Sequence, residues 1–456
     1  MEFIDELVIP ATANHQLLIK YMLMISLLLF IPYLGMVLGA TFLSTRYAKK
    51  GDIEGNPNYK RFAKDVIEKL SITQGAELAL GAIPVLSALF AYAQLLYLSK
   101  TITVSIMALA AVIFIVAFVF VYKYRNTFKI ESILHYYKKL VSKDVVLNPE
   151  DEAVREIEDF EDKNVSLNST SGMVAKWLLL AGSYLFAGTM ALASSPNRWE
   201  HVGNILQVIF SWQSMFSFFA LLSLSGIITG GAIMFYFFSW NGGLKDMTEE
   251  YAAVVKKIAG SIALVSSILF PLMLIFTYIY LPSTAVTPTV FYYFVMVLII
   301  SLVLGNYIYA MAKNSDTGNA TVVFMLILVL ITFNILKDQA AFGNAIQTNL
   351  EEVNKIAEEH EKEAKTKTMQ STGIDPQAIF NQKCSACHKF DVKLVGPPYQ
   401  QTVPKYNGDV QKLAAFIFNP QKIDPAFPPM PNQGLKKKEA NAMAQWLIDQ
   451  VAAGKK

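Results

Sequence analysis

Both cysteines of this 456-residue chain lie in one short sequence, Cys384-Ser385-Ala386-Cys387-His388. Two thiols at this spacing could form a redox-active dithiol, which usually lies near a strand–helix–strand pattern, or could belong to a metal site. The sequence around them shows no strand–helix–strand pattern. The order C-x-x-C-H is typical of covalent haem attachment, because two thiols can form thioethers to the haem vinyl groups while the histidine ligates the iron. We therefore predict one covalent haem c at Cys384 and Cys387, with His388 as an iron ligand.

The sequence around this motif resembles a class I monohaem cytochrome c over residues 374–456. Residues 375–382 match the first helix of such domains, and residues 437–451 match the last. Pro397 stands where the family has a proline whose carbonyl accepts a hydrogen bond from the haem-ligating histidine. The resemblance therefore implies that the Pro397 carbonyl fixes the ring of His388 and raises its basicity.

Two methionines could supply the sixth iron ligand. Met443 lies inside the predicted last helix, where a methionine usually belongs to the core. Met430 lies between prolines in Pro428-Pro429-Met430-Pro431, a stiff loop that can present a thioether without distorting a helix. The resemblance also places the methionine ligand in this loop, and it implies that Trp446 packs against the first helix. We predict His388 and Met430 as the axial ligands, a pair that raises the reduction potential relative to two histidines.

The rest of the chain is strongly hydrophobic, so that 54% of all residues are apolar and only 16% are charged. A soluble domain would carry roughly a quarter charged residues. The apolar residues form blocks long enough for membrane-spanning helices, which need about 20 residues each. We therefore predict an all-α fold, in which a polytopic helical membrane bundle precedes a small α-helical cytochrome c domain. The eight predicted spans are residues 17–43, 72–98, 101–122, 173–193, 205–240, 258–281, 289–312 and 320–337.

The fifth predicted span is longer than one crossing requires. We expect its first part, residues 203–212, to lie along the membrane interface before the helix turns inward. Gly226, Gly230 and Gly231 follow later in the same span, and they predict close contacts with neighbouring helices, because small residues let helix backbones approach.

Loop charge predicts the orientation of the bundle. The loops on one side hold 19 Lys and Arg and those on the other side hold two. By the positive-inside rule the first group is cytoplasmic; it consists of residues 44–71, 123–172, 241–257 and 313–319. With eight spans both chain ends then lie outside, which is where c-type haem is attached. We expect a multi-pass protein of the bacterial inner (cytoplasmic) membrane with a periplasmic cytochrome c domain.

The predicted domains are a transmembrane helical domain over 1–337, a charged helical stalk over 338–373 and the cytochrome c domain over 374–456. The loop 123–172 begins basic and becomes acidic, which predicts a solvated amphipathic helix with a linker. Nucleic-acid binding is not predicted, because the basic residues lie beside hydrophobic segments and form no separate basic domain.

Two titratable residues stand out in the membrane region. Of the five histidines in the chain, only His15 abuts a span, so a four-helix cytochrome b with bis-histidine haems is excluded. A haem b with His15 as one ligand, or a hydrogen bond from His15 to a quinol, stays open. Glu77 is the one acid well inside a span, and intramembrane ionisable residues are functional candidates. We predict that Glu77 serves a proton path or a contact with a neighbouring helix.

The span pattern, with an outer N-terminus near a histidine and an acid in the second span, resembles the large subunit of the cytochrome bd quinol-oxidase superfamily. Some members of that superfamily carry a fused cytochrome c domain. The resemblance implies a b- or d-type haem or a quinone in the membrane domain, and it carries over only His15 and Glu77. The fifth span contains no histidine, and no extended loop separates the sixth span from the seventh.

Two functions are consistent with these features. In the first, the chain is a redox subunit of a respiratory oxidoreductase complex, such as a quinol oxidase or a quinol:acceptor oxidoreductase. It would relay electrons through haem c, with other membrane or peripheral subunits, quinol and a redox partner at the haem edge as its partners. In the second, the helices anchor and dock the cytochrome c domain, and partner subunits hold the catalytic site.

Overall fold

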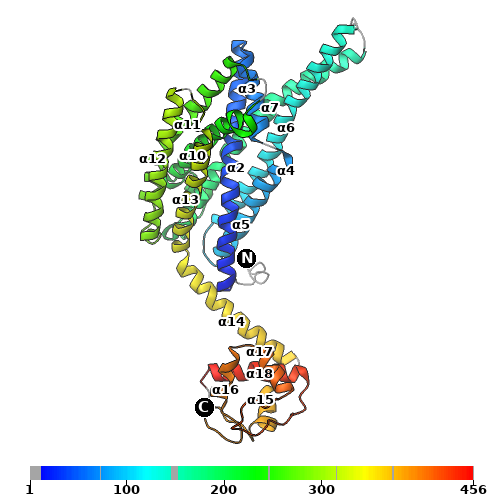
Figure 1. Ribbon diagram of the computed structural model, residues 1–456, viewed down its shortest axis with the longest axis vertical. Helices are drawn as coiled ribbons and strands as arrows, with labels where there is room; N and C mark the ends of the chain where they lie inside the picture. Colours follow the sequence, from blue (N-terminus) through cyan, green and yellow to red (C-terminus); the bar gives the residue numbers. More distant parts are fainter. Residues whose placement is uncertain are drawn as a thin grey trace. The chain divides into compact units, whose positions relative to one another are not determined.

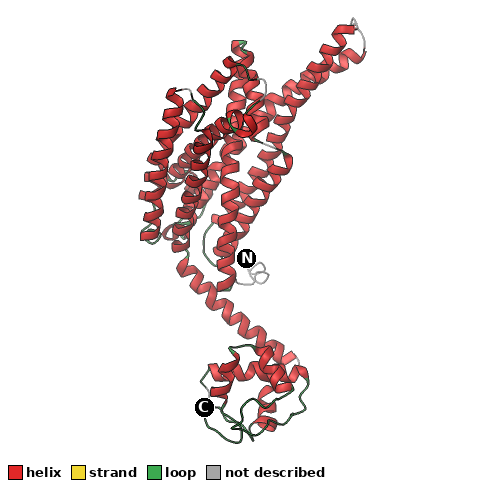
Figure 2. Cartoon of the chain, in the orientation of Figure 1, coloured by secondary structure: helices red, strands yellow, loops and turns green. Residues whose placement is uncertain are grey.

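The computed structural model describes residues 12–71, 73–144, 152–244, 247–314, 316–371 and 374–454. Every regular element within these residues is helical (Figure 2), which confirms the predicted all-α fold. The chain divides into two compact units, Met1–Asn354 and Lys355–Lys456.

The first unit contains eight helices that are long and apolar enough to cross a membrane, counted over the described residues. This number confirms the prediction from hydropathy, and Figure 1 shows the helices side by side in one bundle. They are α2 (Ala13–Glu54), η1 with α5 (Glu77–Ala82 and Ile83–Leu95), α6 (Thr103–Asp144), α7 (Glu152–Ala193), α10 (Trp212–Phe238), α11 (Glu249–Ile279), α12 (Pro288–Asn314) and α13 (Ala320–Ala345).

The helices α6 and α7 continue well beyond their predicted spans and form an antiparallel pair (Figure 1). Each is 42 residues long. In the polar part of the pair, Asn164 Nδ2 donates to the carbonyl oxygen of Thr127 over 3.1 Å, and Asn168 Nδ2 donates to Thr127 Oγ1 over 2.7 Å. Lys138 and Glu161 form an ion pair farther along. Most of the predicted loop 123–172 is therefore helix, held together by polar contacts.

Close packing centres on α10, as the glycines of the fifth span predict. A methyl group at Gly226 would lie 2.1 Å from the Oγ atom of Ser266 on α11. A methyl group at Gly231 would lie 2.2 Å from Cδ1 of Ile327 on α13. At both positions a methyl group would therefore require the facing side chain to move.

The contact between α10 and α2 is equally close. A methyl group at Gly39 of α2 would lie 1.9 Å from Oγ1 of Thr229. Thr229 Oγ1 donates a hydrogen bond to the carbonyl oxygen of Gly35 over 2.9 Å, and Ser225 Oγ donates to the same oxygen over 2.8 Å. Small residues and hydroxyl groups therefore join the two helices at the centre of the bundle.

The fifth span begins with a break, as predicted from its length. A short helix, α9 (Ile205–Ile209), is capped by Asn204 and ends at Phe210. The helix α10 then starts anew, because the Oγ atom of Ser211 accepts a hydrogen bond from the backbone N–H of Ser214 over 3.2 Å. The segment before residue 212 is thus separate from the spanning helix.

The last span extends beyond the predicted residue 337, since α13 continues to Ala345. The helix α14 (Gln347–Ser371) follows, and its first turns are bound to the first unit. Asn349 Nδ2 donates to the carbonyl oxygen of Tyr97 over 3.0 Å, and Gln16 Nε2 donates to Asn354 Oδ1 over 3.0 Å. The charged segment after residue 337 is helical, as predicted, and its first part belongs to the membrane-helix unit.

The second unit consists of short helices around a small aromatic core. The rings of Phe380 and Trp446 lie 5.3 Å apart between centroids, and Phe390 packs against both. The last helix therefore packs on the first, as expected from the sequence. The helical elements are α15 (Pro376–Ile379), η3 (Phe380–Cys384), α16 (Tyr399–Thr402), η4 (Val403–Tyr406), α17 (Val410–Phe418) and α18 (Lys437–Ala452).

Candidate functional site

The C-x-x-C-H residues lie together on one tight turn at the end of η3. The backbone N–H groups of Cys387 and His388 both donate to the carbonyl oxygen of Cys384, over 3.1 and 3.0 Å. Cys384 is buried, whereas Cys387 and His388 are half-buried. The turn therefore holds two thiols and one imidazole within the reach of a single bound group.

The ring of His388 is oriented from the opposite side by the segment 396–399. Its Nδ1 atom lies 2.9 Å from the carbonyl oxygen of Pro397. Because a carbonyl oxygen can only accept, Nδ1 carries the proton and Nε2 is left to bind a metal. The ring also lies against Gly396, where a methyl group would come within 2.3 Å of Cε1, and stacks on Tyr399 with centroids 4.9 Å apart.

The electrostatics of Cys384 do not suit a redox dithiol. Burial raises the pKa of its thiol, and this effect exceeds the opposite effects of a hydrogen bond with Tyr399 and of the charge on Lys383. Reactive thiols of dithiol oxidoreductases instead have a lowered pKa, which makes the thiolate available. The environment of Cys384 therefore does not match that of the attacking thiol in thiol–disulfide exchange.

The two methionines occupy different environments. Met443 lies on α18 with 0% of its surface exposed, within the core of the second unit. Met430 is half-buried in an irregular loop. That loop is tied to the motif side of the unit, because Lys383 Nζ donates to the carbonyl oxygen of Gln433 over 3.0 Å. Burial in the core accounts for Met443, which leaves Met430 free for ligation.

Several apolar side chains of this unit are exposed, and no sequence pattern marks them as functional. Val392, Leu394 and Val395 follow the motif directly, and they are 52%, 43% and 53% exposed. Ile423, shortly before Met430, is 71% exposed. Such a concentration of exposed apolar surface in a small domain indicates a contact with another apolar body. A haem held by His388 would suit these residues, since most of a porphyrin is apolar.

Comparison with known proteins bears on the second unit. Residues 375–449 match the family described as cytochrome c. The chain is 35% identical over 80 residues to cytochrome c-551 of Pseudomonas aeruginosa, covering 17% of this chain and 77% of that protein. The chain belongs to the cytochrome c family. Cytochrome c-551 of Pseudomonas denitrificans is 35% identical over 82 residues, covering 17% of this chain and 96% of the relative. Cytochrome c-552 of Hydrogenobacter thermophilus is 34% identical over 80 residues, covering 17% of this chain and 82% of that relative.

This protein is thus a multi-pass membrane protein with a cytochrome c domain, which implies covalent haem c and electron transfer. The relatives correspond to the domain alone.

Glu77 lies at the start of η1, a π-helical segment of the kind often found at functional sites. Glu77 is 5% exposed. Its electrostatic neighbours are Arg125, which is 9% exposed, and Tyr33, which is 1% exposed. Oε1 of Glu77, Nε of Arg125 and Oη of Tyr33 are all buried without a hydrogen-bond partner among the described residues. Arg125 lies in the predicted loop 123–172, and no local sequence pattern connects it with Glu77.

His15 and Glu77 are not brought together. His15 is exposed in the first turn of α2, and its Nδ1 lies 3.2 Å from Oγ1 of Thr12. Tyr33, next to Glu77, is 18 residues farther along the same helix, which corresponds to about 27 Å. His15 and Glu77 therefore cannot belong to one site.

Proposed function

We propose that this chain is a membrane-bound cytochrome subunit of a respiratory electron-transfer complex, relaying electrons through a single haem c on the outer face of the membrane. The observation that carries the proposal is the arrangement of His388. Its Nδ1 is fixed by Pro397, its Nε2 is available, and two thiols share its turn.

The residues of the domain would act by holding and tuning the haem, which supplies one-electron redox chemistry when bound. Cys384 and Cys387 would attach it covalently. The hydrogen bond from Nδ1 to Pro397 would keep the His388 ring in one orientation and make Nε2 a stronger ligand. A thioether ligand from Met430 would raise the reduction potential relative to a second histidine.

The orientation rests on loop charge. The loops between the predicted spans carry 19 Lys and Arg on one side and two on the other, which supports a cytoplasmic location for the first group. The cytochrome c domain would then lie in the periplasm of a bacterial cell. This location agrees with the outward side on which haem c is attached.

The membrane helices would receive electrons from a quinol or deliver them to an oxidase partner, in line with the resemblance to the cytochrome bd superfamily. Glu77, with Arg125 and Tyr33 beside it, suits a proton path or an internal helix contact. His15, at the outer end of α2, would hydrogen-bond a quinol or ligate a b- or d-type haem. A redox partner would dock at the edge of the haem that is held beside Val392, Leu394 and Val395.

A second candidate function is that of a membrane anchor, in which partner subunits hold the catalytic site. The exposure of His15 and its contact with Thr12 of the same helix end favour this alternative. Haem content separates the two functions, because an anchor carries haem c alone, whereas a catalytic membrane domain carries a b- or d-type haem as well. Pyridine haemochrome spectra of the purified chain measure both types.

Covalent haem is tested by peroxidase staining of a boiled denaturing gel. The full-length band should stain, because thioether bonds survive denaturation, and Cys387→Ala should weaken or abolish the stain. Ser385→Ala is the matched control, since Ser385 lies between the two cysteines and its Oγ only donates to the carbonyl oxygen of Asn381. Staining of the wild-type band that disappears on boiling would refute the proposal.

A further inference from the structure

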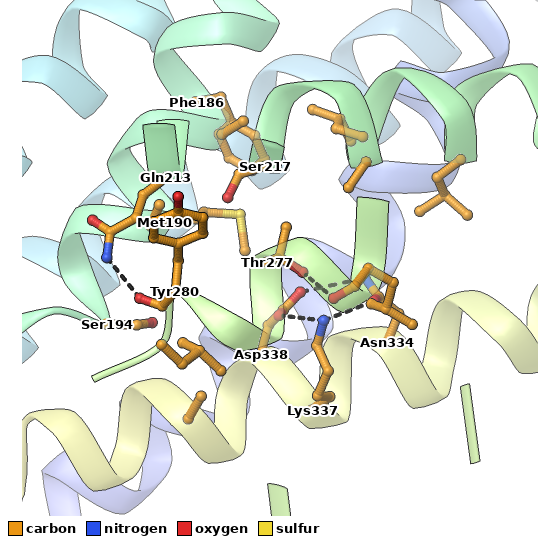
Figure 3. Close-up of a pocket in the computed structure, with 18 of the residues that line it drawn as sticks. Phe186, Met190, Ser194, Gln213, Ser217, Thr277, Tyr280, Asn334, Lys337 and Asp338 are labelled. Carbon is orange, nitrogen blue, oxygen red and sulfur yellow. Dashed lines mark hydrogen bonds and ion pairs between the residues drawn. The ribbon is translucent and has the colours of Figure 1, made fainter. Parts of the chain in front are cut away.

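Six membrane helices, α2, α5, α7, α10, α11 and α13, contribute residues to the wall of a cavity of about 120 Å³ (Figure 3). Phe186, Leu224, Phe270 and Leu274 contribute apolar walls. The cavity lies near the end of α13 that leads into α14. Its surroundings are therefore mostly hydrocarbon, with polar groups concentrated at a few points.

A buried lysine is the most unusual of these polar groups. Lys337 of α13 is 5% exposed, although its charge is costly to place among apolar helices. Its Nζ donates to Oδ1 of Asn334 over 3.2 Å and pairs with Oδ1 of Asp338 over 3.1 Å. Asn334 is itself oriented by donating to Oδ2 of Asp338 over 3.3 Å. The three side chains form one fixed network at the cavity wall (Figure 3).

The network leaves hydrogen-bonding capacity for a ligand. An ammonium group has three protons, and the contacts with Asn334 and Asp338 use two of them. On the facing helices Ser217 and Thr277 supply hydroxyl groups to the same cavity. Thr277 Oγ1 donates its proton to the carbonyl oxygen of Leu274 over 2.8 Å. Its lone pairs can therefore accept a hydrogen bond from another group. A bound molecule would thus meet a cationic donor from α13 and hydroxyl groups from α10 and α11.

We propose that this cavity binds the head group of a lipid-soluble quinone or quinol. A ring with oxygen atoms on opposite sides matches apolar walls with polar groups on facing helices. A cavity of roughly 150 Å³ can hold a benzene ring. At about 120 Å³ this cavity is somewhat smaller, so the flexible side chain of Met190 at its wall would have to move when the ring enters.

The inference rests on the proposed electron-transfer function, because a quinol is the electron carrier that dissolves in the lipid. It assigns the binding to Lys337 and its neighbours, which are distinct from both His15 and Glu77. Neither of those residues lines the cavity.

The test uses the purified full-length, haem-loaded protein in detergent with a photoreactive azidoquinone as the probe. Labelled peptides are identified by mass spectrometry, with and without an excess of unlabelled short-chain quinone. Ala220→Phe places a ring in the cavity without altering any charge. Lys337→Met removes the ammonium donor at similar length. Leu272→Phe is the control, because it adds a ring on α11 at a side chain that is 47% exposed.

Competable labelling of α10, α11 or α13 is expected in the wild type and in Leu272→Phe. Ala220→Phe should abolish it, and Lys337→Met should weaken quinone affinity about tenfold, as expected for one lost hydrogen bond from a charged donor. Labelling that cannot be competed, a co-purified phospholipid in the cavity, or equal labelling of Ala220→Phe would overturn the inference. Haem absorbance of each sample is recorded in parallel, so that a chain with haem and no quinone binding contradicts this inference alone. A chain without haem contradicts the proposed function instead.

Discussion

The carbonyl oxygen of Pro397 lies 2.9 Å from Nδ1 of His388, and the neighbouring Gly396 lies directly against the same imidazole ring. One short segment therefore determines both the proton position and the orientation of the ring. Since the acceptor is a backbone atom, the contact depends on the path of the chain more than on the proline side chain.

Gly396→Ala should impair haem ligation, because the added methyl group would come within 2.3 Å of the His388 ring. We expect a lower haem content per chain, or a visible spectrum that shows loss of the low-spin state. Gly343→Ala is the control, since a methyl group at that position meets no atom within 4 Å. A normal haem content and spectrum in Gly396→Ala would show that the ring is not held as described.

Met430→Leu should abolish the weak near-infrared band from sulfur to iron and lower the reduction potential, with the haem still attached. Met443→Ala should act differently, because Met443 is a fully buried core residue. We expect that variant to retain the band but to lose about 2–5 kcal/mol of domain stability. The pair is measured by near-infrared spectroscopy, redox titration and denaturant unfolding of the full chain. Loss of the band in Met443→Ala alone would transfer the ligand assignment.

The number and positions of the spans could be predicted because about 20 consecutive apolar residues have few structural alternatives. The lengths of α6 and α7 could not, since hydropathy reports the part of a helix that contacts lipid and not where the helix ends. The same reasoning ended the last span at residue 337, although Lys337 is buried and the helix continues to Ala345. In the sequence, a lysine whose charge is paired with Asp338 and hydrogen-bonded to Asn334 cannot be told from a lysine at the edge of the membrane.

The haem motif and its context could be predicted because adjacent residues carry the chemistry. The environment of Glu77 could not, since Arg125 and Tyr33 come from other helices and reach it only through packing. Nor could the exposed surface of Val392, Leu394 and Val395 be foreseen, because exposure depends on what the rest of the domain leaves uncovered.

Gly39→Ala should destabilise the membrane bundle, because the methyl group would lie 1.9 Å from Thr229 Oγ1. Overpacking of this kind typically costs about 1–3 kcal/mol. The added substitution Thr229→Gly should restore part of the loss by removing the clashing side chain. Thermal unfolding in detergent, followed by size-exclusion chromatography, gives the comparison. A stable Gly39→Ala variant would contradict the close contact between α2 and α10.

The orientation is tested with two matched serine-to-cysteine variants at exposed positions, Ser166 on α7 and Ser283 after α11. In intact cells a membrane-impermeant thiol reagent should label Ser283→Cys and leave Ser166→Cys unlabelled until the membrane is permeabilised. The native cysteines would not react, because haem attachment consumes both thiols. The opposite labelling pattern would invert the proposed topology.

In the proposed topology, the length of α7 has a consequence for the cytoplasmic side of the protein. A helix of 42 residues is about 63 Å long, whereas the hydrocarbon layer takes up about 30 Å. About half of the helix would therefore extend beyond the hydrocarbon layer, over a length several times the screening length of about 8 Å at physiological salt. Charges such as Lys138 and Glu161 would be electrically independent of the lipid head groups. A molecule that recognises this distant part of the hairpin would bind equally well whatever the lipid composition.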